Sequence, residues 1–240
     1  MRRGRARQVQ GRAEVKRRDG LLALLALPLA AAAQTAPRPD QVARFGAGHA
    51  AAHRGDLAVL RKLIAGGADV NARDSHGRTP LHVATFARQR GAIAVLADAR
   101  ADLGQLDNDR YDAVTIAAVA DDEETLRLLL ARGASARLTT SRYDGTALIA
   151  AAHLGHDGVV RQLIQAGAPL DHVNNLHWTA VIEAVVLGDG GSRHQATLKA
   201  LLDAGASTKL ADRQGRTPLQ LARDRGYEAM VRLLQAAGGH

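Results

Sequence analysis

The sequence predicts an all-α solenoid of about six helix-turn-helix units, joined by short loops that resemble β-hairpins. Two blocks of nine residues, which open at Asp74 and Asp212, read DSHGRTPLH and DRQGRTPLQ. Residues in the equivalent place of successive blocks stand 33, 34, 33 and 38 positions apart, at Thr79, Asp112, Thr146, Thr179 and Thr217. A regular period of this length is typical of repeat architectures. Aromatic residues make up only 2% of the chain and hydrophobic residues 46%, which favours closely packed helices with a core of small aliphatic side chains.

Each block contains the signals that begin a helix. The Asp-x-x-Gly segment predicts a tight turn, because glycine adopts the positive φ that other residues resist. Thr79 then acts as the N-cap, and Pro80 at the first helical position loses no hydrogen bond. A second helix follows, with Val, Leu and Ile at helical spacing as in residues 159–164, and a glycine such as Gly167 ends it.

These motifs resemble the ankyrin repeat family, whose unit of about 33 residues opens with D-x-x-G-x-T-P-L-H. The resemblance covers about residues 45–240 and includes the segment GADVN at residues 67–71. It implies six units, the first a partial repeat, at residues 45–73, 74–106, 107–139, 140–173, 174–211 and 212–240. The sixth unit is rich in charge, as a solvent-facing cap should be. Residues 34–44, which contain two prolines, are predicted to be a short linker or entry arm.

Three units depart from the family pattern. In the third unit, Asp-Ala-Val at residues 112–114 replaces Thr-Pro-Leu, and Arg110 replaces the glycine of the turn. In the fourth unit, Gly145 stands directly before Thr146, so we expect an irregular hairpin. In the fifth unit, about five residues near 189–193 are inserted between the two helices. The middle of the array is therefore expected to be less regular than its ends.

Residues 1–33 are predicted to form a signal peptide for export. A positive Lys-Arg-Arg at 16–18 precedes an apolar segment at 21–29, and three alanines at 31–33 match an A-x-A cleavage signal, with cleavage after Ala33. The apolar run up to Ala33 is too short for a transmembrane helix, which takes about 20 residues. We therefore expect a periplasmic or secreted mature chain that is not bound to the membrane. The sequence leaves open the Sec or twin-arginine route, and a translation start at Val15 instead of Met1.

The charge distribution argues against a nucleic-acid-binding protein. The chain has a formal net charge of +8, but residues 1–33 hold eight Lys and Arg and two Asp and Glu. The remainder holds 24 basic and 22 acidic residues, a net of +2, whereas a nucleic-acid-binding domain needs a concentrated basic face. There is no cysteine, which excludes disulfides, thiolate metal sites and a cysteine nucleophile.

The sequence contains no convincing catalytic or metal-binding pattern, so we predict neither an enzyme nor a cofactor nor a bound metal. His49 and His53, like His153 and His156, are spaced to share a helix face, but no third ligand accompanies either pair. In the family, the slots of His49 and His156 hold structural histidines. The segment GGSR at 190–193 lacks the strand–turn–helix context of a nucleophile elbow. Acidic residues at 121–124 open a helix, where the helix dipole stabilises them.

The resemblance also implies a binding surface, a concave face lined by the hairpin tips and by the exposed side of each first helix. Four of the six aromatic residues of the chain fall at the family's contact positions, namely Trp178, Tyr111, Phe86 and Tyr143. Aromatic side chains dominate interface hot spots because they bury a large area with few torsions. The alternative is that Tyr111 and Trp178 pack against adjacent hairpins. The predicted surrounding contacts on the same face are His76, Arg78, His153, Leu154 and Leu187.

These features predict an exported scaffold that binds another protein through its concave face and acts as a monomer. The alternative is an immunity or maturation factor that binds one exported enzyme. The sequence does not name the partner, because proteins of one fold bind different partners through side chains that carry no readable code.

Overall fold

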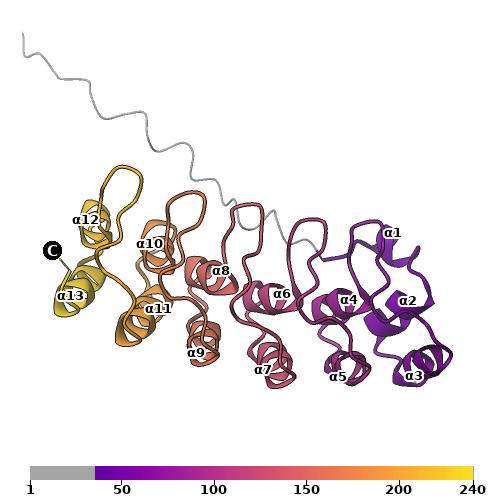
Figure 1. Cartoon of the computed structure of the whole chain (residues 1–240). Coiled ribbons are helices and arrows are strands. Elements are labelled where there is room, and N and C mark those ends of the chain that lie inside the picture. Colours follow the sequence, from indigo (N-terminus) through magenta and orange to yellow (C-terminus); the bar gives the residue numbers. More distant parts are fainter. Residues whose placement is uncertain (1–35, 240) are drawn as a thin grey trace, which may run out of the picture.

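Twelve helices form six antiparallel pairs that stack side by side into a curved solenoid (Figure 1). The structure is a computed structural model that describes residues 36–239, within which there are thirteen helices and no strand. The first helices of the pairs form one row: α2 (Ala47–Arg54), α4 (Pro80–Phe86), α6 (Ala113–Val119), α8 (Ala147–Leu154), α10 (Ala180–Val186) and α12 (Pro218–Asp224). The second helices form the other row: α3 (Leu57–Ala65), α5 (Arg90–Asp98), α7 (Glu123–Ala131), α9 (Asp157–Gln165), α11 (Ser192–Asp203) and α13 (Glu228–Ala236).

The predicted caps begin the helices of the first row. Thr79 and Thr217 each form a capping box with the third helical residue, and a proline follows each of them. Asp112 takes over this role in the third unit, where its side chain accepts a hydrogen bond of 2.9 Å from the amide of Thr115. A carboxylate therefore substitutes for the threonine that the family pattern leads one to expect.

Two positions of the unit, one in each helix of a pair, recur in the core along the stack. A small alanine lies fully buried in every first-row helix: Ala51, Ala84, Ala117, Ala151, Ala184 and Ala222. A buried leucine occupies the equivalent place in the second-row helices from the second unit on: Leu96, Leu129, Leu163, Leu201 and Leu234. In α3 the residue at this place is Leu63, which is half-buried, and Leu60 is the buried leucine. The alanines allow neighbouring units to approach closely, and the leucines fill the space between the two rows. This division of roles explains why aromatic residues are rare in the core of the described residues, where Tyr111 is buried.

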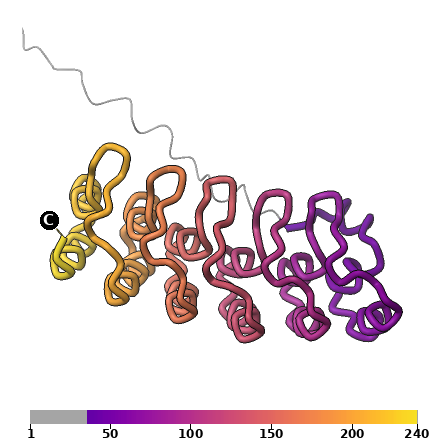
Figure 2. The backbone as a smooth tube through the Cα atoms, in the orientation of Figure 1, coloured from indigo at the N-terminus to yellow at the C-terminus, as the bar shows by residue number. Residues whose placement is uncertain are grey.

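The hairpins between units project from one side of the stack (Figure 2). One turn position has a positive φ in every hairpin, and glycine occupies it only at the two ends, as Gly77 and Gly215. Arg110, Asp144 and His177 occupy it in the middle, with φ of 66°, 51° and 64°. This conformation costs a residue with a Cβ roughly 1 kcal/mol. The middle hairpins are strained, in agreement with the irregularity expected from the sequence.

The hairpin of the fourth unit differs most from the others. It contains a second positive φ, at Ser141, and the structure pairs Thr140 with Gly145 in an isolated antiparallel bridge. Gly145 therefore takes part in the bridge and does not occupy the left-handed turn position, which Asp144 occupies.

The residues inserted in the fifth unit lengthen both the inter-helix loop and α11, which has 12 residues where α9 has nine. The new segment contacts the third and the sixth units. Arg193 bonds Asp121 of the third unit at 2.8 Å, and the Tyr227 hydroxyl of the sixth unit donates to the Gly188 carbonyl at 2.9 Å. The insertion thus ties together units that are not adjacent in the stack.

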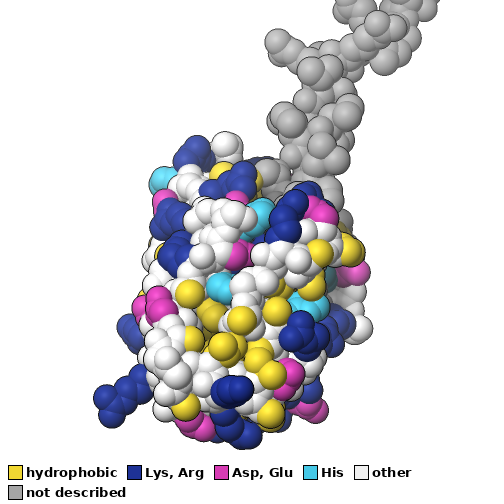
Figure 3. Space-filling view, turned by 90° about the vertical axis from the view of Figure 1, so that its right-hand side faces the viewer, with side chains coloured by type: hydrophobic (Ala, Val, Ile, Leu, Met, Phe, Trp, Pro, Cys, Tyr) yellow, Lys and Arg dark blue, Asp and Glu magenta, His cyan; other side chains and the backbone are white. Residues whose placement is uncertain are grey.

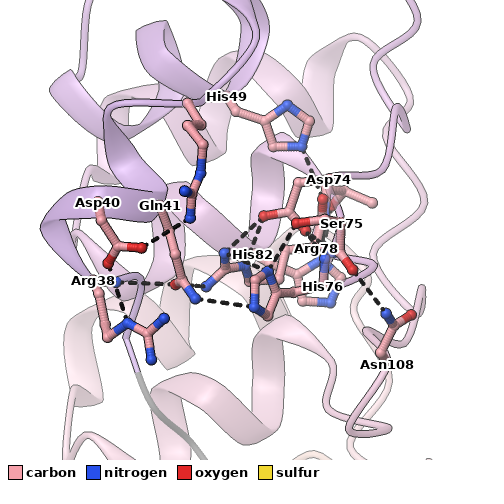
Figure 4. A network of polar contacts seen from close by, with 12 residues as sticks. Arg38, Asp40, Gln41, His49, Asp74, Ser75, His76, Arg78, His82 and Asn108 are labelled. Atoms are coloured by element: carbon pink, nitrogen blue, oxygen red, sulfur yellow. Dashed lines mark hydrogen bonds and ion pairs between the residues drawn. The ribbon is translucent and has the colours of Figure 1, made fainter.

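The segment predicted to be a linker folds back on the array. It contains a short helix, α1 (Pro39–Val42), and Gln41 is buried. The Gln41 amide donates to Nε2 of His76 at 2.9 Å, and the Arg78 guanidinium donates to the Gln41 side-chain oxygen at 3.3 Å (Figure 4). Residues 39–42 therefore form an arm that packs on the first hairpin, whose polar partners only the fold assembles.

The end of the stack that carries α1, α2 and α3 faces the viewer in Figure 3. Hydrophobic side chains gather over its lower half, with Lys and Arg around them. Within residues 36–239, none of the helices is long and apolar enough to cross a lipid bilayer. The predicted signal peptide lies outside the described residues.

Candidate protein-binding groove

A cavity of about 390 Å³ lies between the hairpins and the first-row helices of the central units. We call it the central groove. Its walls come from the hairpins of the third to sixth units and its floor from α6, α8 and α10: Tyr111, Thr115, Val119, Thr140, Ser141, Tyr143, Gly145, Thr146, Ile149, Ala150, His153, Asn174, Leu176, Trp178, Glu183, Val186, Leu187, Arg213 and Gln214. Its size is within the range of typical ligand pockets.

Three aromatic residues converge on the central groove from three successive hairpins. Tyr111, Tyr143 and Trp178 all line it, although they are more than 30 residues apart in the chain. Tyr111 is 7% exposed, whereas Tyr143 and Trp178 are half-buried. Burial raises the pKa of Tyr111 to about 12, so its phenol remains neutral at physiological pH. The groove therefore presents neutral aromatic surface to an incoming group.

Short polar side chains in the hairpins hold the aromatic residues in place. The Asp107 carboxylate accepts a hydrogen bond of 2.9 Å from the Tyr111 amide. In the fifth unit, Asn174 accepts from the amides of Leu176 at 3.0 Å and Trp178 at 2.9 Å. Side-chain oxygens that bind the backbone two and four residues on stabilise a compact turn. The backbone that positions Tyr111 and Trp178 is therefore ordered in the absence of a partner.

Successive hairpins are also hydrogen-bonded to one another. The amide of Asn108 donates to His76 at 2.9 Å, that of Ser141 to Arg110 at 2.8 Å, and that of Asn175 to Tyr143 at 2.9 Å, in each case to the carbonyl oxygen. These bonds join four hairpins edge to edge. Hydrogen bonds therefore join the hairpins of the wall into a continuous surface, as a preorganised binding site requires.

The floor contains a buried polar cluster around Glu183 on α10. This residue is 4% exposed. The Nδ1 of His153 on α8 lies 3.1 Å from one carboxylate oxygen, and the amide nitrogen of Asn174 donates to the other at 3.0 Å. The carboxylate thus connects two first-row helices and the hairpin that holds Trp178.

The structure brings together some of the residues predicted for the binding surface and separates others. Tyr111, Tyr143, Trp178, His153 and Leu187 all line the central groove. Phe86 and Leu154 are half-buried at the ends of their helices, and His76 lies exposed on the first hairpin, but these three lie outside the groove.

Arg78, predicted to contact a partner, is instead part of the protein's own framework. It is 4% exposed and forms a 2.8 Å ion pair with Asp74. Its guanidinium also lies 5.8 Å from the ring centre of Phe45, within reach of a cation–π interaction (Figure 4 shows its polar partners). The first hairpin and the arm at residues 39–42 together enclose the Arg78 side chain. The turn motif alone does not reveal this burial.

Several groove residues were not predicted from the sequence. Val119 and Val186 occupy the same thirteenth place of their units that singled out Phe86, so the repeat register contains the signal for them. Glu183 has no such signal. Its role depends on the distance between α10 and α8, which is a property of the stacking.

Each of the histidine pairs considered for metal binding contains a histidine that connects two units. His49 Nε2 bonds the Arg78 carbonyl at 2.8 Å, and His156 Nδ1 bonds the Ala118 carbonyl at 2.9 Å. Among the described residues there is no group of three or more His, Asp or Glu side chains arranged to hold a metal ion.

A stack of helix pairs with a preformed groove along its hairpins defines a repeat protein of the solenoid class. A family model for ankyrin repeats matches in three copies, at residues 29–107, 48–140 and 114–212. The chain belongs to the ankyrin repeat family. Ankyrin repeats are in general scaffolds for protein–protein interaction and are typically not enzymes.

Similar proteins occur in bacteria. The chain is 36% identical over 189 residues to the ankyrin repeat protein YahD of Escherichia coli (strain K12). The alignment covers 78% of this chain and 94% of YahD. The crystal structure of an ankyrin repeat domain from Acinetobacter baumannii AYE aligns with a TM-score of 0.77 and 42% identity, over 80% of this chain and 98% of that one.

A third similarity concerns the fold alone. A chain in the complex of the predatory endopeptidase Bd0816 from Bdellovibrio bacteriovorus with the immunity protein Bd3460 aligns with a TM-score of 0.63 at 24% identity. The match covers 80% of this chain and 98% of that one.

Proposed function

We propose that this protein is an exported scaffold that binds another folded protein through the central groove. The observation that carries the proposal is the convergence of Tyr111, Tyr143 and Trp178, from three hairpins, on one cavity of about 390 Å³. A protein whose core contains few aromatic residues exposes part of two of them here. Aromatic anchors in a preformed concave site are typical of interface hot spots.

The proposal of export depends on the leader at residues 1–33, whose basic, apolar and small-residue segments follow the order of a signal peptide. Fractionation of cells that express the chain with its own leader, followed by intact-mass measurement, tests it. We expect a mature species that begins at Gln34 in the exported fraction. An unprocessed chain in the cytoplasm would contradict export.

Partner binding is tested by recovering the tagged chain from the exported fraction and identifying what co-purifies with it. We expect Trp178→Ala to weaken the complex by about 2 kcal/mol, roughly thirtyfold in Kd. Tyr143→Ala should act in the same direction. Val59→Ala and Val173→Ala, at exposed apolar residues outside the groove, are the matched controls and should leave Kd unchanged. Unchanged affinity in both groove variants would refute the site.

The same experiment separates the scaffold from the narrower alternative, an immunity or maturation factor for one exported enzyme. The fold is shared by a chain in the endopeptidase–immunity protein complex described above. Recovery of one enzyme at a stoichiometry of one to one, with its activity altered by the complex, would favour the alternative. Several partners of lower affinity would favour the scaffold.

A further inference from the structure

Glu183 is a buried carboxylate in an otherwise largely apolar groove. It is 4% exposed, and it lines the cavity together with Ile149, Val186 and Leu187. Its two hydrogen-bond partners are Asn174, which is neutral, and His153, which is charged only when protonated. No lysine or arginine in residues 36–239 forms an ion pair with it.

A carboxylate in such a place lacks a permanent counter-charge. Removing a charged group from water is costly unless an opposite charge and hydrogen bonds compensate for the loss. Hydrogen bonds from an amide and an imidazole satisfy part of the demand. Because Glu183 is shielded from bulk solvent, a cation supplied by a protein partner could compensate the negative charge of its carboxylate.

The walls of the groove suit a cation as well. Tyr111, Tyr143 and Trp178 line it with aromatic side chains, and a cation close to the face of such a ring is attracted by its quadrupole, most strongly when it is shielded from water. Tyrosine and tryptophan also pack well against the aliphatic stem of a long basic side chain.

Arg213 is the one lysine or arginine among the groove residues, and its own guanidinium has a different partner. It donates to the backbone carbonyl of Asn175, on the hairpin of the fifth unit. Arg213 therefore stays at the rim, while Glu183 lies on the floor between α8 and α10.

Building on the proposed function, we infer that the central groove accepts a basic side chain, lysine or arginine, from the partner protein. The charged head pairs with Glu183, and the stem lies between the aromatic residues of the hairpins. A partner that binds here presents an exposed basic residue on a protruding loop or terminus, because the site is a recess below the hairpin tips.

Trp178 is the only tryptophan of the chain, so its fluorescence and its indole N–H signal in NMR report on the groove alone. The probe is Nα-acetyl-arginine methylamide, titrated into the purified chain at neutral pH. The matched control is the citrulline derivative, which has the same shape and no charge. We expect a saturable response in the millimolar range for arginine, and at least about tenfold weaker binding for citrulline.

Two variants locate the effect. Glu183→Gln keeps a similar shape but removes the charge, and it should reduce arginine binding towards the level of citrulline, with the attraction of the aromatic rings for the cation remaining. Tyr143→Leu, which removes a half-buried aromatic ring and leaves Glu183 in place, should weaken arginine binding severalfold. The thermal unfolding midpoint of each variant shows that it folds.

Equal binding of arginine and citrulline, no saturable response to either, or full arginine binding by folded Glu183→Gln would each overturn the inference. Its failure is distinct from failure of the proposed function. A partner whose binding depends on Trp178 but not on Glu183 would leave the groove as a protein-binding site without the cation. If the groove binds arginine but the affinity for the partner protein does not depend on Trp178, the cation site stands and the proposed protein-binding site fails.

Discussion

Asp122 performs two structural tasks at once, and separating them tests how the units are held together. Its side chain caps α7 by accepting from the Thr125 amide at 3.1 Å and the Thr125 hydroxyl at 2.6 Å. Arg90, from the preceding unit, donates to the same carboxylate at 2.8 Å. Asp122 is 4% exposed, whereas the side chain of Arg90 is 41% exposed.

The structure indicates the size of each contribution. Loss of an N-cap costs about 1 kcal/mol and leaves a buried donor unsatisfied, whereas an ion pair with a well-exposed arginine contributes about 0.5 kcal/mol. We expect Asp122→Ala to lower the free energy of unfolding by about 2 kcal/mol. Asp122→Asn keeps an oxygen that can cap the helix, so it should lower this free energy by less than about 1 kcal/mol.

Urea unfolding at neutral pH measures these differences from the midpoint and slope of each transition. Asp203→Ala is the matched control, since Asp203 pairs with Lys199 at 2.6 Å on an exposed helix face and caps nothing. It should change stability by less than 0.5 kcal/mol. If Asp122→Asn destabilises the protein as much as Asp122→Ala, the charge and not the cap is responsible, and the reasoning is refuted.

The same carboxylate has a predictable dependence on pH. Burial raises the pKa of Asp122, but hydrogen bonds from Thr125 and Arg90 outweigh it and hold the net pKa below the usual 3.8. The native state therefore binds this proton less readily than the unfolded chain. The contribution of Asp122 is fully present above pH 3.8 and is lost as the pH falls below it, a loss that Asp122→Ala should lack.

Three further predictions concern other contacts between and within units. Burial lowers the pKa of His82 below 6.5, so the free energy of unfolding should fall as the pH drops from 7 to 5, and less steeply in His82→Gln, as measured by urea unfolding at each pH. Burial raises the pKa of Asp112, one of whose oxygens has no hydrogen-bond partner, so Asp112→Thr should stabilise the protein by about 1 kcal/mol in the same assay, and a loss of stability would contradict this. Arg193→Ala should lower stability by about 0.5 kcal/mol, an effect that disappears in 1 M salt, because this arginine is half-exposed.

Much of the fold could be predicted because its signals are local. Thr79, Pro80 and Gly77 specify a turn and the start of a helix whatever lies around them. Leu96 and Leu129, one period apart, lie in the core because each helix must bury its apolar side against the next pair. The left-handed turn position was also readable, even though Arg110 occupies it in place of glycine.

The residues of the groove were only partly predictable. Repeat register picked out Trp178 and Tyr143, since equivalent positions face the same side of the stack. It also picked out Arg78, which the arm around Gln41 buries. The position of a residue within the repeat predicts the side of the stack that its side chain faces. It does not predict whether another segment of the chain covers that side chain.

The sequence by itself determined the repeat unit, its number and the class of the fold, because capping residues, turn residues and apolar spacing act within a few positions of one another. Only the tertiary structure decided which side chains share the groove. Glu183, His153 and Asn174 meet there because α8, α10 and a hairpin approach one another across units. Such contacts depend on how the units stack, and the curvature of the stack is a sum of small rotations that no single unit records.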